Sequence, residues 1–429
     1  MGDHRTPSGL SLILRAFRHR NYRLFFIGQS ISLIGTWMTQ VATAWLVYRL
    51  TRSVFMLGVI GFSSQIAAFL LAPAAGVLTD RWNRHRILVV TQVLSMIQSF
   101  ALALLALTGV IEIWHIVLLS VVQGLTNAFD IPARQSFVVD LVQEKGDLAN
   151  AIALNSSMFN GARLLGPPVA GLVIAVGGEG LCFLMDGISY LAVIGMLLAM
   201  QALPKGVGAR KAHIAQEFVQ GIRYAVSSVP IRLLLLLVAF VSFMGLPYAV
   251  LMPAFSKEVL HGDPHVFGLL MGSAGLGAFV GSIYLASRRS VRGLVKLTAL
   301  SAAVFGFGLM ALAFSRTLWV SSGLLLVIGF GMIVQMAASN TVLQTIVDDD
   351  KRGRIMSLFT MAFIGMSPWG SLVAGGLASW VGVPRALLLS GASCVAGAAV
   401  FASQLPRLKA VIRPIYVRMG IIQEVASGI

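Results

Sequence analysis

Two charged residues, Arg163 and Asp186, stand inside stretches of sequence that are otherwise apolar. A charge near the middle of a bilayer costs about 2.5–3.5 kcal/mol on insertion scales, so such a residue is usually paired and functional. The carboxyl group of Asp186 could take up a proton during a working cycle, or it could tie its helix to neighbouring helices. Helical rise separates the two α-carbons by about 12 Å in depth, so a direct pair between them is not favoured.

The surrounding composition indicates which elements must position these charges. The chain is 57% hydrophobic and 11% charged, whereas about a quarter of a soluble domain is charged. Ten charge-free runs, from 24–48 to 386–406, are nearly all as long as the roughly 20 residues that span a bilayer. Two further spans lie within 148–204. Twelve spans without a barrel pattern predict an all-α membrane protein.

The net charge of +16 is distributed by side of the membrane. With twelve spans, most Lys and Arg residues fall at the two termini and in the even-numbered loops. This asymmetry predicts that both termini are cytoplasmic, and it argues against a nucleic-acid partner. The few basic residues expected on the opposite side are Arg49, Arg52, Lys257, Arg316 and Arg385.

A polar, glycine-containing stretch divides the twelve spans into two sets of six. Hydrophobic residues recur there at helical spacing, which predicts an amphipathic helix on the cytoplasmic membrane face. The predicted organisation is an N-terminal cytoplasmic tail (1–23), a six-helix bundle (24–203), the cytoplasmic linker (204–231), a second six-helix bundle (232–406) and a C-terminal cytoplasmic tail (407–429).

A short charged loop joins the second and third predicted spans. Its distinctive residues are Gly76, Asp80, Arg81, Arg84 and Arg86. The glycine allows close approach of a neighbouring helix, and Asp80 is expected near the N-terminal end of span eleven, where the helix dipole favours an anion. The arginines are expected to pair with acids at nearby helix ends, Asp130 foremost. The simpler alternative is an ordinary positively charged loop.

This loop resembles the one between the second and third helices of major facilitator superfamily transporters, where it acts as a gating latch. The stretch from Asp130 to Gln135, with Pro132 and Arg134, resembles the drug:proton antiporter-3 branch, which includes siderophore and macrolide exporters. The resemblance implies the major facilitator fold, in which two pseudo-symmetric six-helix bundles enclose a substrate path. It also implies a gating role for Asp130 and Arg134, which could otherwise be solvated loop charges.

Span five carries a glycine–proline pattern that consists of Gly161, Gly166, Pro167 and Gly171. It resembles the motif of exporters in this superfamily, so the resemblance implies export. Glycines open a groove for a neighbouring helix, and a proline removes a backbone donor and bends the span. Close packing around a kink is the alternative explanation.

In this fold, spans one, four, seven and ten line the substrate cavity. No acid or base lies in the middle of these four spans, so the chamber suits bulky amphiphilic molecules of weak polarity. Helix packing is the alternative role for each candidate. The candidate lining residues are Gln29, Trp37, Gln40, Gln123, Asn127, Phe243, Tyr248, Gln335 and Asn340.

The resemblance implies a multi-pass transporter of the bacterial inner membrane that exports a small amphiphilic molecule, such as a drug or siderophore, by alternating access in exchange for protons. Ser120 stands where many antiporters carry an arginine before the Gln123–Gly124 pair, so proton coupling is inferred from the branch alone. A lysophospholipid flippase and a transporter-like sensor or scaffold are the alternatives.

We expect no cofactor, no metal and no enzyme activity, because no nucleophile–base set, metal spacing or phosphate-binding loop stands out. The expected partners are the substrate, protons and membrane lipids, and the chain is expected to be a monomer.

Overall fold

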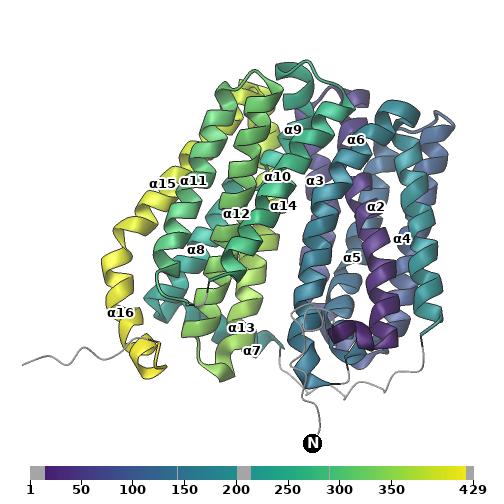
Figure 1. Cartoon of the computed structure of the whole chain (residues 1–429). Helices are drawn as coiled ribbons and strands as arrows, with labels where there is room; N and C mark the ends of the chain where they lie inside the picture. The colour runs from purple at the N-terminus through teal and green to yellow at the C-terminus, as the bar shows by residue number, and fades with distance from the viewer. Residues whose placement is uncertain (1–14, 143, 201–213, 289, 422–429) are drawn as a thin grey trace, which may run out of the picture.

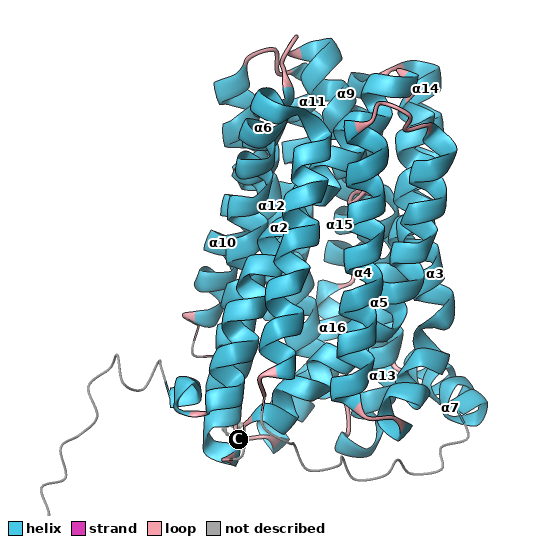
Figure 2. Ribbon diagram, turned by 90° about the vertical axis from the view of Figure 1, so that its right-hand side faces the viewer, coloured by secondary structure: helices cyan, strands magenta, loops and turns pink. Residues whose placement is uncertain are grey.

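The structure is a computed structural model that describes residues 15–142, 144–200, 214–288 and 290–421. Within these ranges, the side chains at 72–74, 76–77, 80–81, 145 and 214–218 lie outside the description. The described residues form helices joined by short loops and contain no strand, as Figure 2 shows. The prediction of an all-α fold is therefore confirmed.

The helices run in chain order through a first set, a linker helix and a second set. The first set is η1 (Arg15–Arg18), α2 (Arg20–Thr51), α3 (Val54–Arg81), α4 (Arg84–Leu107), α5 (Ile113–Leu141) and α6 (Lys145–Leu198). The linker helix is α7 (Ile214–Ser227). The second set is α8 (Val229–Met244), α9 (Tyr248–Ala254), η2 (Phe255–Val259), α10 (Pro264–Ala286), α11 (Leu294–Phe314), α12 (Leu318–Ile346), α13 (Asp349–Thr360), η3 (Met361–Gly365), α14 (Met366–Val381), α15 (Val383–Ser403) and α16 (Leu405–Arg418).

Ten helical segments in the described part of the chain are long and apolar enough to cross a membrane. One of them, α6, changes direction at Gly178, whose φ of 75° and ψ of 177° are not helical, so it accounts for two crossings. The long helix α2 is not among the ten, but at 32 residues it exceeds the length of a span. The predicted twelve crossings are consistent with this arrangement.

Local sequence explains where several helices begin. The side chain of Ser53 accepts a hydrogen bond from the Met56 N–H at the start of α3, and Asn83 accepts one from Arg86 at the start of α4. Asp263 does the same for Val266 at the start of α10. These are N-caps, in which a short polar side chain satisfies a backbone donor that has no partner inside the helix.

Figure 1 shows two bundles side by side, α2–α6 in one and α8–α15 in the other. We call them the N-half and the C-half. The described residues nearest the two chain ends lie at the same end of the molecule, which we call the terminus end, and the linker helix α7 also lies there (Figures 1 and 2). The opposite end is the far end.

The two halves meet through the same kind of glycine contact at two places. A Cβ added to Gly171 of α6 would lie 3.2 Å from Gly268 Cα of α10, and one added to Gly375 of α14 would lie 3.0 Å from Gly58 Cα of α3. These two small-residue contacts join the halves, because glycines let helix backbones approach closely. The pseudo-symmetry that the sequence predicted is therefore present in the contacts themselves.

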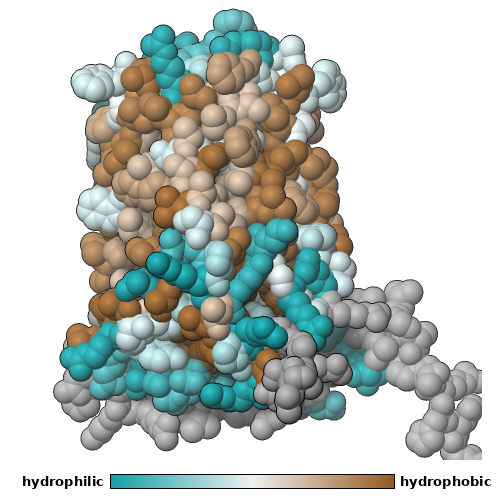
Figure 3. Space-filling model, turned by 90° about the vertical axis from the view of Figure 1, so that its left-hand side faces the viewer, coloured by the Kyte–Doolittle hydropathy of each residue, from teal (hydrophilic) through white to brown (hydrophobic). Residues whose placement is uncertain are grey.

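The outer surface is apolar over the middle of the molecule. On the face in Figure 3, hydrophobic residues fill the central band and hydrophilic residues gather toward both ends. Large side chains such as Val176, at 89% exposure, face outward. Exposed tryptophans lie at both ends of the molecule: Trp82 at the terminus end, and Trp319 and Trp380 at the far end. Tryptophans are expected at the two interfaces of a bilayer.

The structure refines the predicted boundaries. Helix α2 begins at Arg20, inside the stretch assigned to the N-terminal tail, and helix α16 occupies much of the predicted C-terminal tail. The predicted linker helix corresponds to α7, and the described chain then continues almost directly into α8.

Candidate functional site

Asp186 lies in the second crossing of α6, inside the N-half, and only 1% of it is exposed. Its Oδ2 accepts hydrogen bonds from Thr39 Oγ1 and Ser99 Oγ, each at 2.8 Å, and Ser189 Oγ lies 3.5 Å from Oδ1. Gly35 of α2 makes room for the carboxyl group, because a Cβ there would lie 2.5 Å from Oδ1. A hydroxyl can donate to a carboxylate or rotate to accept from a carboxylic acid, so this cage accommodates both protonation states.

A second buried acid, Asp130, lies in α5 toward the terminus end and is 2% exposed. It accepts from Thr91 Oγ1 and Gln92 Nε2, both at 2.9 Å, and it forms an ion pair with Arg134 one turn along the same helix. Asp130 was predicted to be the foremost partner of the loop arginines, but its ion-pair partner is Arg134 of its own helix, so the prediction is wrong for Arg84. Arg84 binds Asp140 instead, at 2.9 Å.

A row of buried polar residues on α4 runs between these two acids. Gln123 of α5 donates to Ser95 in the middle of the row at 3.3 Å and to Asn127 at 3.1 Å. The first and last residues of the row are eight positions apart, which corresponds to about 12 Å along the helix. We call this row the α4 polar stripe, and it consists of Thr91, Gln92, Ser95, Gln98 and Ser99.

Arg163 lies where the two halves meet. Its guanidinium carbon is 5.7 Å from the centre of the Trp37 ring of α2, and Nη2 is 3.9 Å from the sulfur of Met332 in α12. The hydroxyl group of Tyr248 in α9 faces the same guanidinium. Asp186 is hydrogen-bonded to hydroxyl groups within the N-half, so Arg163 and Asp186 have separate surroundings.

The candidate lining residues differ in accessibility. Gln29 and Gln335 are 2% and 3% exposed, and the Nε2 of each lacks a hydrogen-bond partner within the described structure. Tyr248 is also buried, Trp37, Phe243, Gln123, Asn127 and Asn340 are half-buried, and Gln40 is exposed. The structure therefore gathers only part of the predicted set, around Arg163, through Trp37 and Tyr248.

The glycine–proline motif packs against α10 of the other half. The Pro167 carbonyl oxygen would lie 2.5 Å from a Cβ on Gly268. Gly166 instead faces α2, where a Cβ would lie 2.5 Å from the Trp37 Cβ, and a Cβ on Gly161 would meet nothing within 4 Å. These contacts favour close packing for Gly166, Pro167 and Gly171.

The central part of the predicted latch cannot be placed. The Gly76, Asp80 and Arg81 positions lie outside the described side chains, although the backbone there belongs to α3. Arg86 is exposed. The latch thus remains a prediction.

The far end holds contacts between the halves that the sequence analysis missed. Tyr48 of α2 donates a hydrogen bond to Glu258 of η2, and the Trp45 ring stacks on Phe267 of α10 with centroids 6.1 Å apart. Within the N-half, Arg49 forms two hydrogen bonds with Glu179, at 2.9 and 3.0 Å. The only signal in the sequence was the presence of charged and aromatic residues at the ends of spans.

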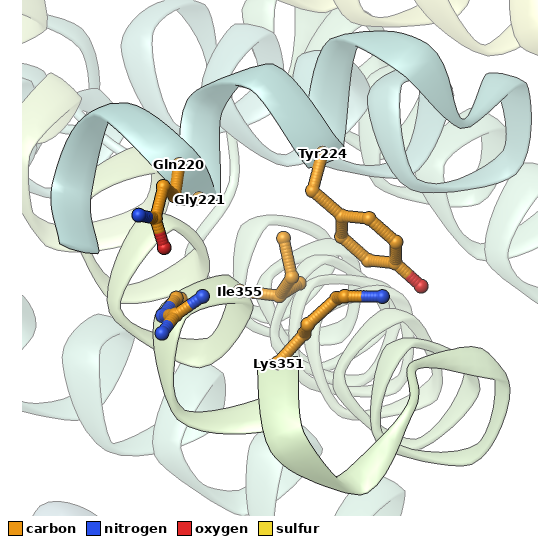
Figure 4. Close-up of a pocket in the computed structure, with 6 residues that line it drawn as sticks. Gln220, Gly221, Tyr224, Lys351 and Ile355 are labelled. Carbon is orange, nitrogen blue, oxygen red and sulfur yellow. The ribbon is translucent and has the colours of Figure 1, made fainter. Parts of the chain in front are cut away.

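A separate pocket of about 230 Å³ lies at the terminus end, between α7 and α13 (Figure 4). The Lys351 Nζ lies 4.6 Å from the centre of the Tyr224 ring and forms an ion pair with Asp348 at 3.2 Å. This hydrogen bond to Lys351 holds the pKa of the Asp348 carboxyl below its ordinary value. The contacts dock the linker helix on the C-half, away from Arg163 and Asp186.

Comparisons with known proteins agree with this geometry. The family model described as transmembrane secretion effector, MFS_3, matches residues 13–416. The staphyloferrin A transporter of Staphylococcus aureus is 24% identical over 88% of this chain and 95% of its own length. The multidrug efflux pump Tap of Mycolicibacterium fortuitum is 26% identical over 87% and 93%, and the enterobactin exporter EntS of Escherichia coli is 25% identical over 84% and 85%.

Solved structures show the same fold. A mutant of the nucleoside transporter NupG superposes with a TM-score of 0.69 at 14% identity, over 91% of this chain and 99% of the other. A bacterial homologue of the human lysosomal transporter Spinster, in an inward-facing and unoccupied conformation, gives 0.65 at 15% identity, over 96% and 99%. With a family model that covers nearly the whole chain, this multi-pass membrane protein belongs to the transmembrane secretion effector family of major facilitator transporters, whose members are transporters and not enzymes.

Proposed function

We propose that the chain is an efflux permease that exports a small amphiphilic molecule by alternating access, with protons moving in the opposite direction. Relatives that export siderophores, macrolides and drugs support this substrate range. The distribution of Lys and Arg supports a cytoplasmic terminus end and a location in the bacterial inner membrane. The protein works as a monomer in contact with membrane lipids.

The observation that carries the proton coupling is the environment of Asp186. Among the described residues, this carboxylate is held only by hydroxyl groups, is 1% exposed and has no cation to fix its charge. Loss of solvation disfavours the ionised form of a buried carboxyl. Access of water from either side of the membrane would therefore change its protonation, and the bound proton could travel with the conformational change.

The α4 polar stripe gives this proton a route. It extends from Asp186, through Ser99 and Ser95, toward Asp130 near the terminus end. Hydroxyl and amide groups both donate and accept hydrogen bonds, so they can pass or orient a proton together with water. Asp130, Arg134 and the loop latch of Gly76, Asp80, Arg81, Arg84 and Arg86 are then proposed to close the terminus end.

The contacts between the halves support alternating access. Both matched glycine contacts and the Tyr48–Glu258 and Trp45–Phe267 pairs join the N-half to the C-half. Two packed bodies linked by a limited set of side-chain contacts can rock about a central path. Export is favoured over import by the printed activities of the relatives.

The test replaces the buried carboxyl with an amide of the same shape. In proteoliposomes, Asp186→Asn is expected to abolish substrate movement driven by a proton gradient while substrate–substrate exchange continues. The control Glu112→Gln removes an acid in an exposed part of the far end and should leave both activities intact. Undiminished proton-driven efflux in Asp186→Asn would eliminate the proton role. Movement of headgroup-labelled lysophospholipid without substrate-dependent proton flux would instead support a flippase.

A further inference from the structure

The strongest unexplained feature is the cation at the junction of the two halves. The backbone of Arg163 also packs against α10 of the other half, because a Cβ on Gly275 would lie 2.7 Å from the Arg163 carbonyl oxygen. Arg163 as a whole is half-buried, and its guanidinium is surrounded by side chains from α2, α9 and α12. Helices of both bundles therefore meet at this one charge.

The surroundings of Arg163 contain apolar and aromatic groups but no carboxylate partner within the described residues. Its neighbours are the Trp37 ring, the Met332 sulfur and the Tyr248 hydroxyl. Asp186, on the second crossing of α6, is hydrogen-bonded to Thr39, Ser99 and Ser189 instead. A permanently charged side chain in such a place requires an anion from elsewhere to balance it.

We infer that Arg163 binds a carboxylate group of the transported molecule, and that Trp37 and Tyr248 hold the adjoining aromatic or aliphatic body. A guanidinium presents a planar fork of donors that matches a carboxylate in two parallel hydrogen bonds. The Trp37 face and the polarisable Met332 sulfur offer the contact that an apolar body needs next to that headgroup. The substrate class is thus an amphiphilic carboxylic acid.

The inferred carboxylate headgroup differs from the weakly polar substrate that the sequence predicted. That prediction rested on spans one, four, seven and ten. Arg163 belongs to span five and lies beside Trp37 of span one and Tyr248 of span seven. The carboxylate assignment rests on the proposed function, because it concerns the substrate of the same central path. A single cation at the contact of both halves also means that the bound anion touches the N-half through Arg163 and the C-half through Tyr248 and Met332.

The test measures binding of matched pairs of probes to the purified protein in detergent, without any gradient. The probes are naphthalene, pyrene and steroid carboxylates, each paired with its methyl ester, and binding is followed by quenching of tryptophan fluorescence. The wild type is expected to bind at least one carboxylate about 10- to 100-fold more tightly than its ester. Equal binding of acid and ester across the panel would overturn the inference.

Variants assign the preference to one side chain. Arg163→Gln is expected to remove the preference and to leave ester binding within about twofold, and Arg163→Lys should keep part of it, since the charge remains without the fork. Trp37→Leu should weaken acid and ester together. The control Arg385→Gln, at an exposed far-end arginine, should change neither. A preference that persists in Arg163→Gln refutes the assignment, and the wild-type comparison stands even if that variant does not fold.

The two proposals fail in different ways. If export or proton coupling is wrong, the acid–ester preference survives in the binding measurement while gradient-driven transport is missing. If the carboxylate assignment is wrong, transport and proton flux survive, and the preference is missing.

Discussion

The N-half and the C-half share a backbone plan and differ in what fills it. Gly187 of α6 faces the Phe100 ring, which a Cβ would approach to 2.7 Å, and Gly391 of α15 faces Met310 in the same way at 2.8 Å. This matched contact sets Asp186 in the place that Ser390 occupies in the C-half. Both glycines at the preceding bends, Gly178 and Gly382, have positive φ.

The space beside the carboxylate shows the difference most directly. A Cβ on Gly35 of α2 would run into Asp186 Oδ1, whereas one on the corresponding Gly245 would run into the Phe305 ring and the Cys394 sulfur. An acid and its hydroxyl cage fill one half, and an aromatic ring fills the same space in the other. All the acids that are buried in the described structure, Asp130, Asp147, Glu179 and Asp186, belong to the N-half.

The helices α4 and α11 repeat this contrast along their length. Counted from the start of each helix, the α4 polar stripe corresponds to Ser301, Ala302, Phe305, Gly308 and Leu309 of α11, which are also buried. Asp130 of α5 and Gln335 of α12 also correspond, because they lie equally far from the starts of these two 29-residue helices. At these matched positions the C-half is mostly filled by apolar side chains, whereas the N-half carries polar and acidic ones.

The largest effect is expected from exchanging the residues at the corresponding positions 186 and 390. Ser390→Asp places a carboxylate in an apolar, close-packed site without the donors that Thr39 and Ser99 supply, and should lower the free energy of unfolding by about 3–5 kcal/mol. Asp186→Ser leaves two hydroxyls poorly paired and should cost about 1–3 kcal/mol. Unfolding in detergent measures both. If the two changes have equal effects, the halves do not differ as described.

The next prediction compares Asp130 with Gln335. Asp130→Asn removes the charge that pairs with Arg134 and should lower the free energy of unfolding by about 2–3 kcal/mol. This is at the low end of the range for breaking a buried ion pair, because the Arg134 side chain is 22% exposed. Gln335→Leu removes an amide whose Nε2 has no hydrogen-bond partner among the described residues and should change the free energy of unfolding by less than about 1 kcal/mol. A large loss in Gln335→Leu would reveal a polar network in the C-half.

A third prediction tests what the halves have in common. Gly171→Ala and Gly375→Ala each push a methyl group into the backbone of the opposite half, at 2.8 Å from the Pro264 oxygen and 3.0 Å from Gly58 Cα. Both should lower stability by a similar amount, about 1–2 kcal/mol. Gly161→Ala is the control, since its Cβ meets open space and alanine favours the helix. Unequal losses at the two contacts would contradict the pseudo-symmetry.

The smallest effect concerns the linker helix on the C-half. The pKa of Asp348 is lowered by Lys351, so its stabilising contribution is complete above the ordinary Asp range and is lost as the pH falls through the lowered value. When the pH is lowered below the ordinary pKa range of Asp, the Tm of the wild type should therefore fall slightly more than the Tm of Asp348→Asn. Parallel Tm curves for the two proteins would show that the Asp348–Lys351 ion pair beside the linker helix contributes nothing.

Sequence patterns predicted the fold because they depend on local physics. Apolar run length predicted the spans, which agree with the long apolar helices, and the charged loop motif predicted the superfamily, which agrees with the family model. The glycine–proline pattern of span five correctly marked a close helix contact, but its partner glycines, Gly268 and Gly275, went unnoticed. Their spacing in α10 was a small-residue signal of the kind that marks helix interfaces.

The partners of the charges could not be predicted in the same way. The sequence showed that Arg163 and Asp186 interrupt apolar spans, but not that hydroxyls from α2 and α4 surround the acid or that Trp37 and Met332 surround the base. It also favoured Asp130 as the partner of the loop arginines, and Arg84 binds Asp140 instead.

The sequence by itself therefore determined the helical type of the spans, the division into halves and the positions of the rare charges, because hydropathy and helical periodicity act over a few turns. Only the tertiary structure decided which charges are paired, which half is polar inside and which residues face the junction. Those outcomes depend on contacts between helices more than a hundred residues apart, such as Thr39 with Asp186 and Arg163 with Met332, and the facing sides of such helices are set by packing and not by local pattern.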